Sequence, residues 1–81
     1  MLVFAVHQVS EPALFWSGQL DLPQGTELRA AIPSQDGSHG VCIFKSDSVE
    51  TVRNVVDSAT RKISTNKFYP IDEANLFGLT A

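Results

Sequence analysis

The 81-residue sequence predicts an α+β domain in which two helices cover one face of a four-stranded antiparallel sheet. Short β-branched and aromatic segments alternate with two helical patterns in the order strand, helix, strand, strand, helix, strand. A turn signal joins the two middle strands. With 43% hydrophobic and 19% charged residues, the composition is typical of a folding chain. At this length we expect a single domain over residues 1–81.

The first strand and the first helix are predicted close to the N-terminus. Residues 2–9 (LVFAVHQV) form a strand whose two alternating faces are both mostly apolar. A short helix follows, with Ser10 as its capping residue and Pro12 in its first turn, where a proline forfeits no hydrogen bond. The large side chains of Phe15 and Trp16 are expected to anchor this helix.

The second and third strands are predicted to form a hairpin. Residues 26–32 alternate between a wetter face and an apolar face, the latter made of Thr26, Leu28, Ala30 and Ile32. Asp36 and Gly37 are a turn signal because both residue types tolerate positive φ. The third strand, residues 39–45 (HGVCIFK), again has apolar side chains on both faces.

The second helix has the most regular pattern of the sequence. Its apolar residues recur at spacings of three and four, at Val49, Val52, Val56, Ala59 and Ile63. Asp47 or Ser48 is expected to cap its N-terminus. Because valine-rich helices form poorly in isolation, this helix should depend on burying its apolar stripe against the sheet.

The C-terminal part is predicted to add an edge strand and an apolar tail. Residues 66–71 (NKFYPI) form the fourth strand, and Pro70 places it at a sheet edge because proline cannot donate to a central ladder. The tail, residues 72–81, ends in the large apolar residues Leu76, Phe77 and Leu79. These side chains need a surface on which to dock.

The order of elements matches a ferredoxin-like βαββαβ sandwich, in which right-handed crossovers place both helices on one face of the sheet. The first and third strands should be central in this plan, yet they are apolar on both faces. The uncovered face would expose more apolar surface than monomers usually leave in water. A second copy is the simplest cover, so we expect a homodimer that forms a dimeric α/β barrel.

Charge and hydropathy exclude two classes of partner. Six basic and nine acidic residues give a net charge of −3, and the basic residues are scattered rather than gathered in a stripe. A nucleic acid or an anionic lipid surface is therefore not an expected partner. No segment reaches the ~20 apolar residues that a membrane-spanning helix requires. The apolar start of the chain lacks the flanks of a signal peptide, and Cys42 is the single cysteine, so we expect a soluble, cytoplasmic protein.

A family resemblance covers most of the chain. It is carried by Pro12, Phe15-Trp16, Asp36-Gly37, residues 41–44 (VCIF), residues 47–50 (DSVE), Val52-Arg53, Ser64, Asn66, Phe68-Tyr69 and Ile71-Asp72. In these residues the chain resembles an uncharacterised family of small bacterial ferredoxin-like proteins. More broadly it is similar to the dimeric α/β-barrel superfamily, which includes cofactor-free monooxygenases, haem-handling proteins, cyclases and small metal-binding proteins. The resemblance implies a shape and a dimer, not a particular chemistry.

Aromatic residues and one histidine are the candidate ligand-binding residues. Arg29 or Tyr69 could orient a polar end of a flat apolar ligand in a pocket lined by Phe4, Trp16, Phe44, Phe68 and Tyr69. His7 lies mid-strand among apolar residues, facing either the helix layer or the interior of a barrel. The competing interpretation is that the aromatic residues are ordinary core and that His7 is a buried histidine with a satisfied hydrogen bond.

The sequence shows no metal-binding or catalytic signature. His7, His39 and Cys42 lack the paired short spacings of a zinc site, so no metal and no cofactor are predicted. His39 is interpreted as an exposed residue after a turn, and Cys42 as a small buried hydrophobic residue. Motifs of hydrolases, phosphate-binding loops and dinucleotide-binding folds are missing, so catalytic residues stay unassigned.

Three functional hypotheses follow. The leading one is a dimer that binds a small apolar molecule, based on the apolar strands and the aromatic set. The second is a cofactor-free monooxygenase or isomerase with His7 and Tyr69 as acid and base. The third is a structural module whose sheet face or tail binds another protein. A cavity beside a buried His7 is the observation that would favour the first two.

Overall fold

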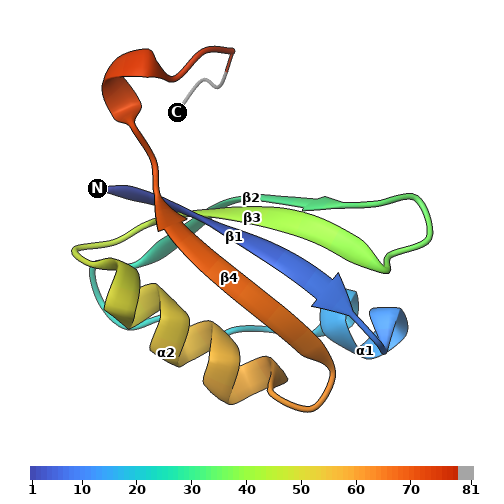
Figure 1. Cartoon of the computed structure of the whole chain (residues 1–81). Coiled ribbons are helices and arrows are strands. Elements are labelled where there is room, and N and C mark those ends of the chain that lie inside the picture. The colour runs from blue at the N-terminus through green and yellow to red at the C-terminus, as the bar shows by residue number, and fades with distance from the viewer. Residues whose placement is uncertain (79–81) are drawn as a thin grey trace.

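The computed structural model describes residues 1–78. It contains, in chain order, β1 (Leu2–Val9), α1 (Pro12–Ser17), β2 (Glu27–Pro33), β3 (His39–Lys45), α2 (Val49–Thr60), β4 (Ser64–Pro70) and the 3₁₀ turn η1 (Glu73–Asn75). The strands form one antiparallel sheet, and both helices lie on the same side of it (Figure 1). The α+β architecture and the four-stranded antiparallel sheet are confirmed. The arrangement is compatible with a ferredoxin-like sandwich.

The strand order is β2-β3-β1-β4, which places β1 and β3 in the centre of the sheet. Both central positions were predicted. The fourth strand is an edge strand, as the proline at its end requires, because Pro70 has no N–H to donate to a further neighbour. The next residue, Ile71, still donates its backbone N–H to the Leu2 carbonyl at 2.9 Å.

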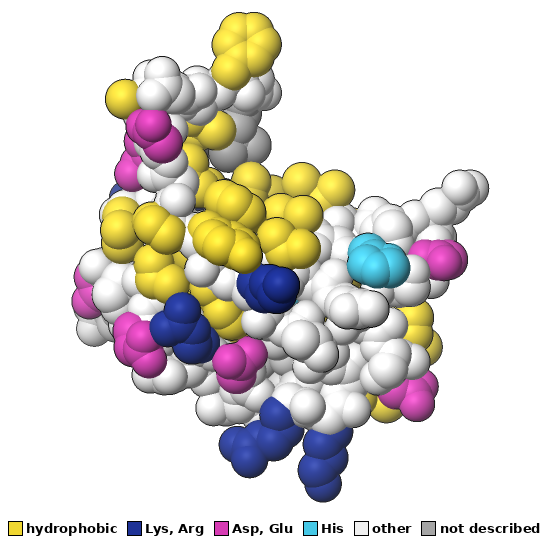
Figure 2. Space-filling model, in the orientation of Figure 1, with side chains coloured by type: hydrophobic (Ala, Val, Ile, Leu, Met, Phe, Trp, Pro, Cys, Tyr) yellow, Lys and Arg dark blue, Asp and Glu magenta, His cyan; other side chains and the backbone are white. Residues whose placement is uncertain are grey.

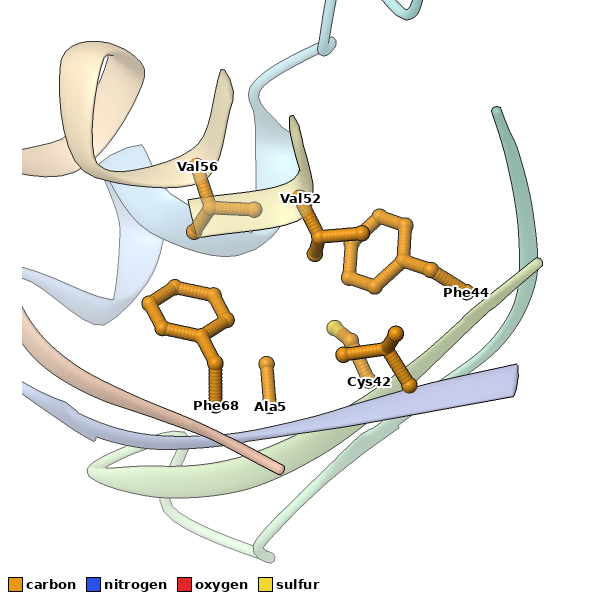
Figure 3. Close-up of a cluster of buried hydrophobic side chains, with 7 residues drawn as sticks. Ala5, Cys42, Phe44, Val52, Val56 and Phe68 are labelled. Atoms are coloured by element: carbon orange, nitrogen blue, oxygen red, sulfur yellow. The ribbon is translucent and has the colours of Figure 1, made fainter. Parts of the chain in front are cut away.

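The hydrophobic core lies between the sheet and α2. On β1, the side chains at odd positions from Val3 to Val9 are buried and those at even positions are not. The buried cluster combines residues of β1, β3 and β4 with two valines of α2, and its members are Val3, Ala5, Cys42, Phe44, Val52, Val56 and Phe68 (Figure 3). Cys42 is therefore a small buried hydrophobic residue, as interpreted.

A β-bulge at Arg29 changes the predicted alternation of β2. Leu28 pairs with Phe44, but the next paired residue is Ala30, which lies opposite Ile43. The extra residue shifts the phase of the strand, so Leu28 and Ala31 share the helix side while Ala30 and Ile32 face away from the helices. The prediction of one continuous apolar face from residue 26 to 32 was wrong.

The first helix is only six residues long, and it docks on the β2–β3 turn through its tryptophan. Trp16 Nε1 donates to the carbonyl of Gly37 at 2.8 Å. The ring lies directly over Gly40, where a Cβ would collide with it. Ser10 does not cap the helix as predicted, because its hydroxyl donates to the Ile63 carbonyl at 3.1 Å. The residue at the cap is Glu11, and its side chain makes no capping bond.

The second helix follows its prediction at the N-terminus and ends earlier than its apolar stripe. Ser48 is the capping residue, since its hydroxyl accepts the Thr51 N–H at 3.1 Å. Val52, Val56 and Thr60 face the sheet and are buried. Ile63, which the spacing assigned to the helix, lies beyond its last turn. Neither helix of the described chain is long and apolar enough to cross a membrane.

The side of the sheet turned away from the helices carries a band of apolar residues, called here the open face. The open face consists of Leu2, Phe4, Val6, Ala30, Ile32, Val41, Ile43 and Tyr69, and Figure 2 shows hydrophobic side chains gathered beside the C-terminal segment. Residues 71–78 rise from the end of β4 away from the helices (Figure 1). The Phe77 side chain is 96% exposed on this segment, and Leu79 lies outside the described residues.

Candidate functional site

A cavity of about 420 Å³ lies between the sheet and the helices. It exists because α1 is short. Six helical residues span ~9 Å, whereas an eight-residue strand spans ~26 Å. The remainder of the sheet is covered by the irregular segment after α1, from which Leu20 and Leu22 pack against the core. The walls are mostly apolar, and include Phe15, Trp16, Cys42, Phe44 and Val56.

His7 is the buried polar residue of this cavity wall. It stands on β1, on the helix side, and its side chain is 1% exposed. Its Nδ1 lies 2.7 Å from Asn66 Oδ1, the residue directly opposite it on β4. Its Nε2 is buried and is the one side-chain nitrogen or oxygen of this kind in residues 1–78 that has no hydrogen-bond partner.

The hydrogen bonds of Asn66 fix the tautomer of His7. Asn66 Nδ2 donates to Asp57 Oδ1 at 2.9 Å and to Thr60 Oγ1 at 3.0 Å. An ionised carboxylate only accepts, so the amide nitrogen must face Asp57, and the amide oxygen must face the imidazole. The proton shared with Asn66 therefore belongs to His7 Nδ1. This leaves Nε2 as an unprotonated acceptor.

Burial keeps the imidazole neutral. Removal from water lowers the pKa of His7 below its ordinary 6.5, and this effect outweighs the hydrogen bond that His7 donates to Asn66 and the charge of Asp57, which both raise the pKa. At neutral pH the side chain is thus a hydrogen-bond acceptor and a base of reduced strength. It is neither a positive charge nor an acid there.

Aromatic rings of α1 pack around the imidazole. The ring centroid of Phe15 lies 4.9 Å from that of His7, and the centroid of Trp16 lies 6.2 Å away with its ring nearly perpendicular. Both residues come from the helix that docks on the β2–β3 turn. The position of α1 therefore decides how closely the imidazole is enclosed.

Cys42 also lines the cavity but is not a nucleophile at neutral pH. Burial raises the pKa of its thiol to about 11, so the thiolate that acts as a nucleophile is not populated at neutral pH. His39 is exposed, and the burial pattern of β3 places it on the opposite face of the sheet from Cys42. Within residues 1–78, no three His, Cys, Asp or Glu side chains come together as a metal site.

The structure divides the predicted ligand-binding residues between the two faces of the sheet. His7 and Phe44 line the cavity. Phe4 and Tyr69 stack on each other across the open face, with ring centroids 5.2 Å apart. Arg29 is at the bulge of β2, where its side chain pairs with Glu27 at 3.1 Å. Ligand binding by any of them stays a prediction.

This division separates the proposed acid and base. His7 faces the helices and Tyr69 faces away from them, so the two side chains of one chain do not share a site. The sequence alone does not decide on which face of the sheet His7 lies, because β1 is apolar on both faces. The two acid–base candidates lie on opposite faces of the sheet within one chain, and catalysis by either of them stays a prediction.

Three polar residues of the site escaped sequence reasoning. Asp57 and Thr60 come from α2 and Asn66 comes from β4, and they meet at His7. The helical pattern assigns Asp57 to the solvent side, and the signal that finds Asn66 is the β1–β4 register. If Val3 pairs with Pro70, then His7 must pair with Asn66. That register is not evident from either strand alone.

A second hollow, of about 470 Å³, lies where β1 ends and β4 begins. It is shallower and more polar, and it is bounded by Arg61, Lys62 and the ends of the two strands. In the described part of the chain it contains no buried polar atom without a partner. The cavity beside His7 is therefore the better candidate site.

Comparison of the chain with models of protein families, with curated proteins and with solved structures found no match.

Proposed function

We propose that the protein binds a small, largely apolar molecule in the cavity between its sheet and helices, with His7 as the polar contact. The observation that carries this proposal is the unpartnered Nε2 of a buried imidazole in the wall of an otherwise apolar cavity. A buried polar group without a hydrogen bond costs ~1–3 kcal/mol. A ligand that supplies the missing bond recovers that free energy.

The composition of the cavity supports a small molecule. Its volume falls within the ~300–1,000 Å³ of typical ligand pockets, which are mostly apolar with a few polar groups that orient the ligand. The aromatic rings of Phe15, Trp16 and Phe44 offer flat contact surfaces. Burying apolar ligand surface against them stabilises a complex by ~25 cal/mol per Å² before the costs of association.

We also propose that two copies associate through their open faces. Ile32 is 53% exposed and Tyr69 is 44% exposed on this surface, and Phe77 projects from the segment that rises beside it. A two-fold pairing of the faces buries these side chains and gives the tails a partner to contact, as in the dimeric α/β-barrel superfamily. A cytoplasmic location stays a prediction that accompanies this proposal.

Binding is tested by titrating the purified protein with propylbenzene. Trp16 is the only tryptophan of the chain and lines the cavity, so its fluorescence reports occupancy directly. We expect a saturable change in the wild type and a loss of affinity in Ala31→Leu, which fills the cavity from β2. Its neighbour Ala30 points to the open face, so Ala30→Leu should bind as the wild type does.

Two results would contradict the proposal. One is an unchanged fluorescence signal at saturating propylbenzene, together with native mass spectra that show no co-purified small molecule. The other is equal weakening of binding by both leucine substitutions, because the ligand would then not occupy the cavity.

A second candidate function is base catalysis in the same cavity without a cofactor. The hydrogen-bonded series Asp57, Asn66 and His7 favours it, because it holds one tautomer and leaves Nε2 free to take a proton. The cavity wall contains no second side chain that is suited to act as an acid. Binding is therefore the function that the geometry supports best.

A further inference from the structure

We infer that the ligand of this cavity is a neutral molecule with a hydroxyl group that donates a hydrogen bond to His7 Nε2, and that a phenol is the best-fitting class. This inference rests on the proposed binding function and specifies its ligand. It follows from the direction of one hydrogen bond, the charge of the cavity wall and the shape of the side chains around it.

The direction of the hydrogen bond is set by Asn66. Its amide donates to Asp57 and Thr60, so its oxygen accepts from His7 Nδ1 and the proton is held there. Nε2 offers only a lone pair to its surroundings. A ketone, an ether or an ester would bring a second acceptor against that lone pair, whereas a hydroxyl brings the missing donor.

The charge of the wall excludes ions. The cavity is lined by apolar residues together with His7, Gln19, Thr60 and the protonated thiol of Cys42, and none of its lining residues is Asp, Glu, Lys or Arg. An ionised ligand would have to leave water without an opposite charge to meet it, which is costly in an apolar site. The nearest carboxylate in the His7 network, Asp57, further disfavours an anion.

The rings beside the imidazole favour an aromatic ligand. Phe15, Trp16 and Phe44 line the same cavity, and Phe15 packs against His7 itself. Aromatic pairs in offset or edge-to-face geometry contribute beyond their buried area. A phenol places its ring among these side chains and its hydroxyl at Nε2, so both requirements are met by one compact molecule.

Nε2 is closed to solvent, so a ligand reaches it only when a neighbouring side chain shifts. The first helix is the element best suited to yield. It has six residues, none of them buried, and no side-chain capping bond. Its tryptophan holds it to the β2–β3 turn by a hydrogen bond, whereas Phe15 is only partly buried and packs on His7 and Trp16. Elements with so few buried contacts open at low free energy.

The test compares four ligands that share a propylphenyl group: 4-propylphenol, propylbenzene, 4-propylanisole and 4-propylbenzoate. Each is titrated against the wild-type protein by calorimetry and by Trp16 fluorescence. We expect 4-propylphenol to bind about tenfold more tightly than propylbenzene, because one buried hydrogen bond that relieves an unpaired acceptor is of that order. The anisole should bind no better than propylbenzene, and the benzoate should bind most weakly.

His7→Phe supplies the matched variant. It removes the acceptor and keeps a flat side chain, while Asn66 Oδ1 still accepts from Ser64 Oγ at 3.0 Å. The preference for the phenol should disappear in this variant and persist in His39→Phe, which alters the exposed histidine on the opposite face. Imidazole ¹⁵N spectra of the wild type give a second readout: 4-propylphenol should shift His7 Nε2 and leave it unprotonated.

The outcomes separate the two proposals. Equal binding of phenol, anisole and hydrocarbon by the wild type overturns the donor inference and leaves the binding function standing. Tightest binding of the benzoate overturns the donor inference in the same way. Binding of none of the four ligands overturns the proposed function and this inference together. If His7→Phe does not fold, the ¹⁵N shift decides, and an unmoved Nε2 resonance counts against the inference.

Discussion

His7 and Asn66 stand opposite each other on β1 and β4, and the 2.7 Å contact between Nδ1 and Oδ1 ties the cavity wall to α2 through Asp57. The Asn66 amide thus joins β1, β4 and α2. Its removal should lower the stability of the fold and disturb the cavity wall at the same time.

Asn66→Ala tests this hydrogen-bond network. The substitution leaves the His7 Nδ1 proton without an acceptor in a buried place, which should lower the free energy of unfolding by ~1–3 kcal/mol. Asn54→Ala is the matched control, since Asn54 is an exposed asparagine on α2. Urea denaturation measures both. Equal stability losses in the two variants would show that the Asn66 network contributes nothing.

Acid should weaken the fold through His7. Burial lowers the folded pKa of His7 below 6.5, so the unfolded chain takes up its proton first as the pH falls. The stability given by the neutral imidazole is complete above about pH 6.5 and is lost progressively as the pH drops toward the lower folded pKa. The melting temperature of the wild type should therefore fall more than that of His7→Phe between about pH 7 and about pH 5.5. Parallel melting profiles for the two proteins would contradict this assignment.

Gly40→Ala should displace the Trp16 ring. A Cβ at this position would overlap the ring of Trp16, which lies on the glycine and donates to Gly37. We expect a loss of ~1–3 kcal/mol of stability, the usual cost of forcing an extra methyl group into a packed site. The fluorescence of Trp16 should also move toward the spectrum of a solvated indole. Gly18→Ala is the milder comparison, because Gly18 is exposed, has a negative φ of −71° and would place its Cβ 3.3 Å from the Leu14 carbonyl oxygen rather than within the Trp16 ring. An unchanged emission spectrum in Gly40→Ala would show that the ring has not moved.

Charge on the open face should separate the proposed dimer. Ile32→Lys places an ammonium group on the β2 side of the apolar band, so the sedimenting mass should shift from that of two chains toward that of one. Leu14→Lys alters an even more exposed leucine, 62% accessible on α1, and should leave the mass of the particle unchanged. A wild-type protein that sediments as one chain at micromolar concentration would rule out the pairing.

Much of the fold is predictable because it depends on local pattern. The valines of α2 recur at helical spacing, the Ser48 cap is visible in the sequence, and Pro70 identifies an edge strand. The bulge at Arg29 was missed for a physical reason. Both faces of β2 contain small or apolar residues, so a shift of phase leaves the hydrophobic pattern almost unaltered.

The candidate site was predictable only in part. His7 and Phe44 were singled out by residue type, and the cavity shows them on a common wall. The cavity itself depends on where α1 stops, and its C-terminal boundary is poorly marked in the sequence. Asn66 and Asp57 reach His7 through strand register and helix position, which are properties of the assembled chain.

The bulge at Arg29 and the proline at the end of β4 affect which surfaces of this chain can associate with a second copy. Both outer strands are interrupted, β2 by an unpaired residue and by Pro33 at its end, and β4 by Pro70. Such interruptions hinder the addition of further strands along a rim, which is the route to fibrous polymers. The proposed pairing of open faces would therefore give a closed pair that strand addition does not extend.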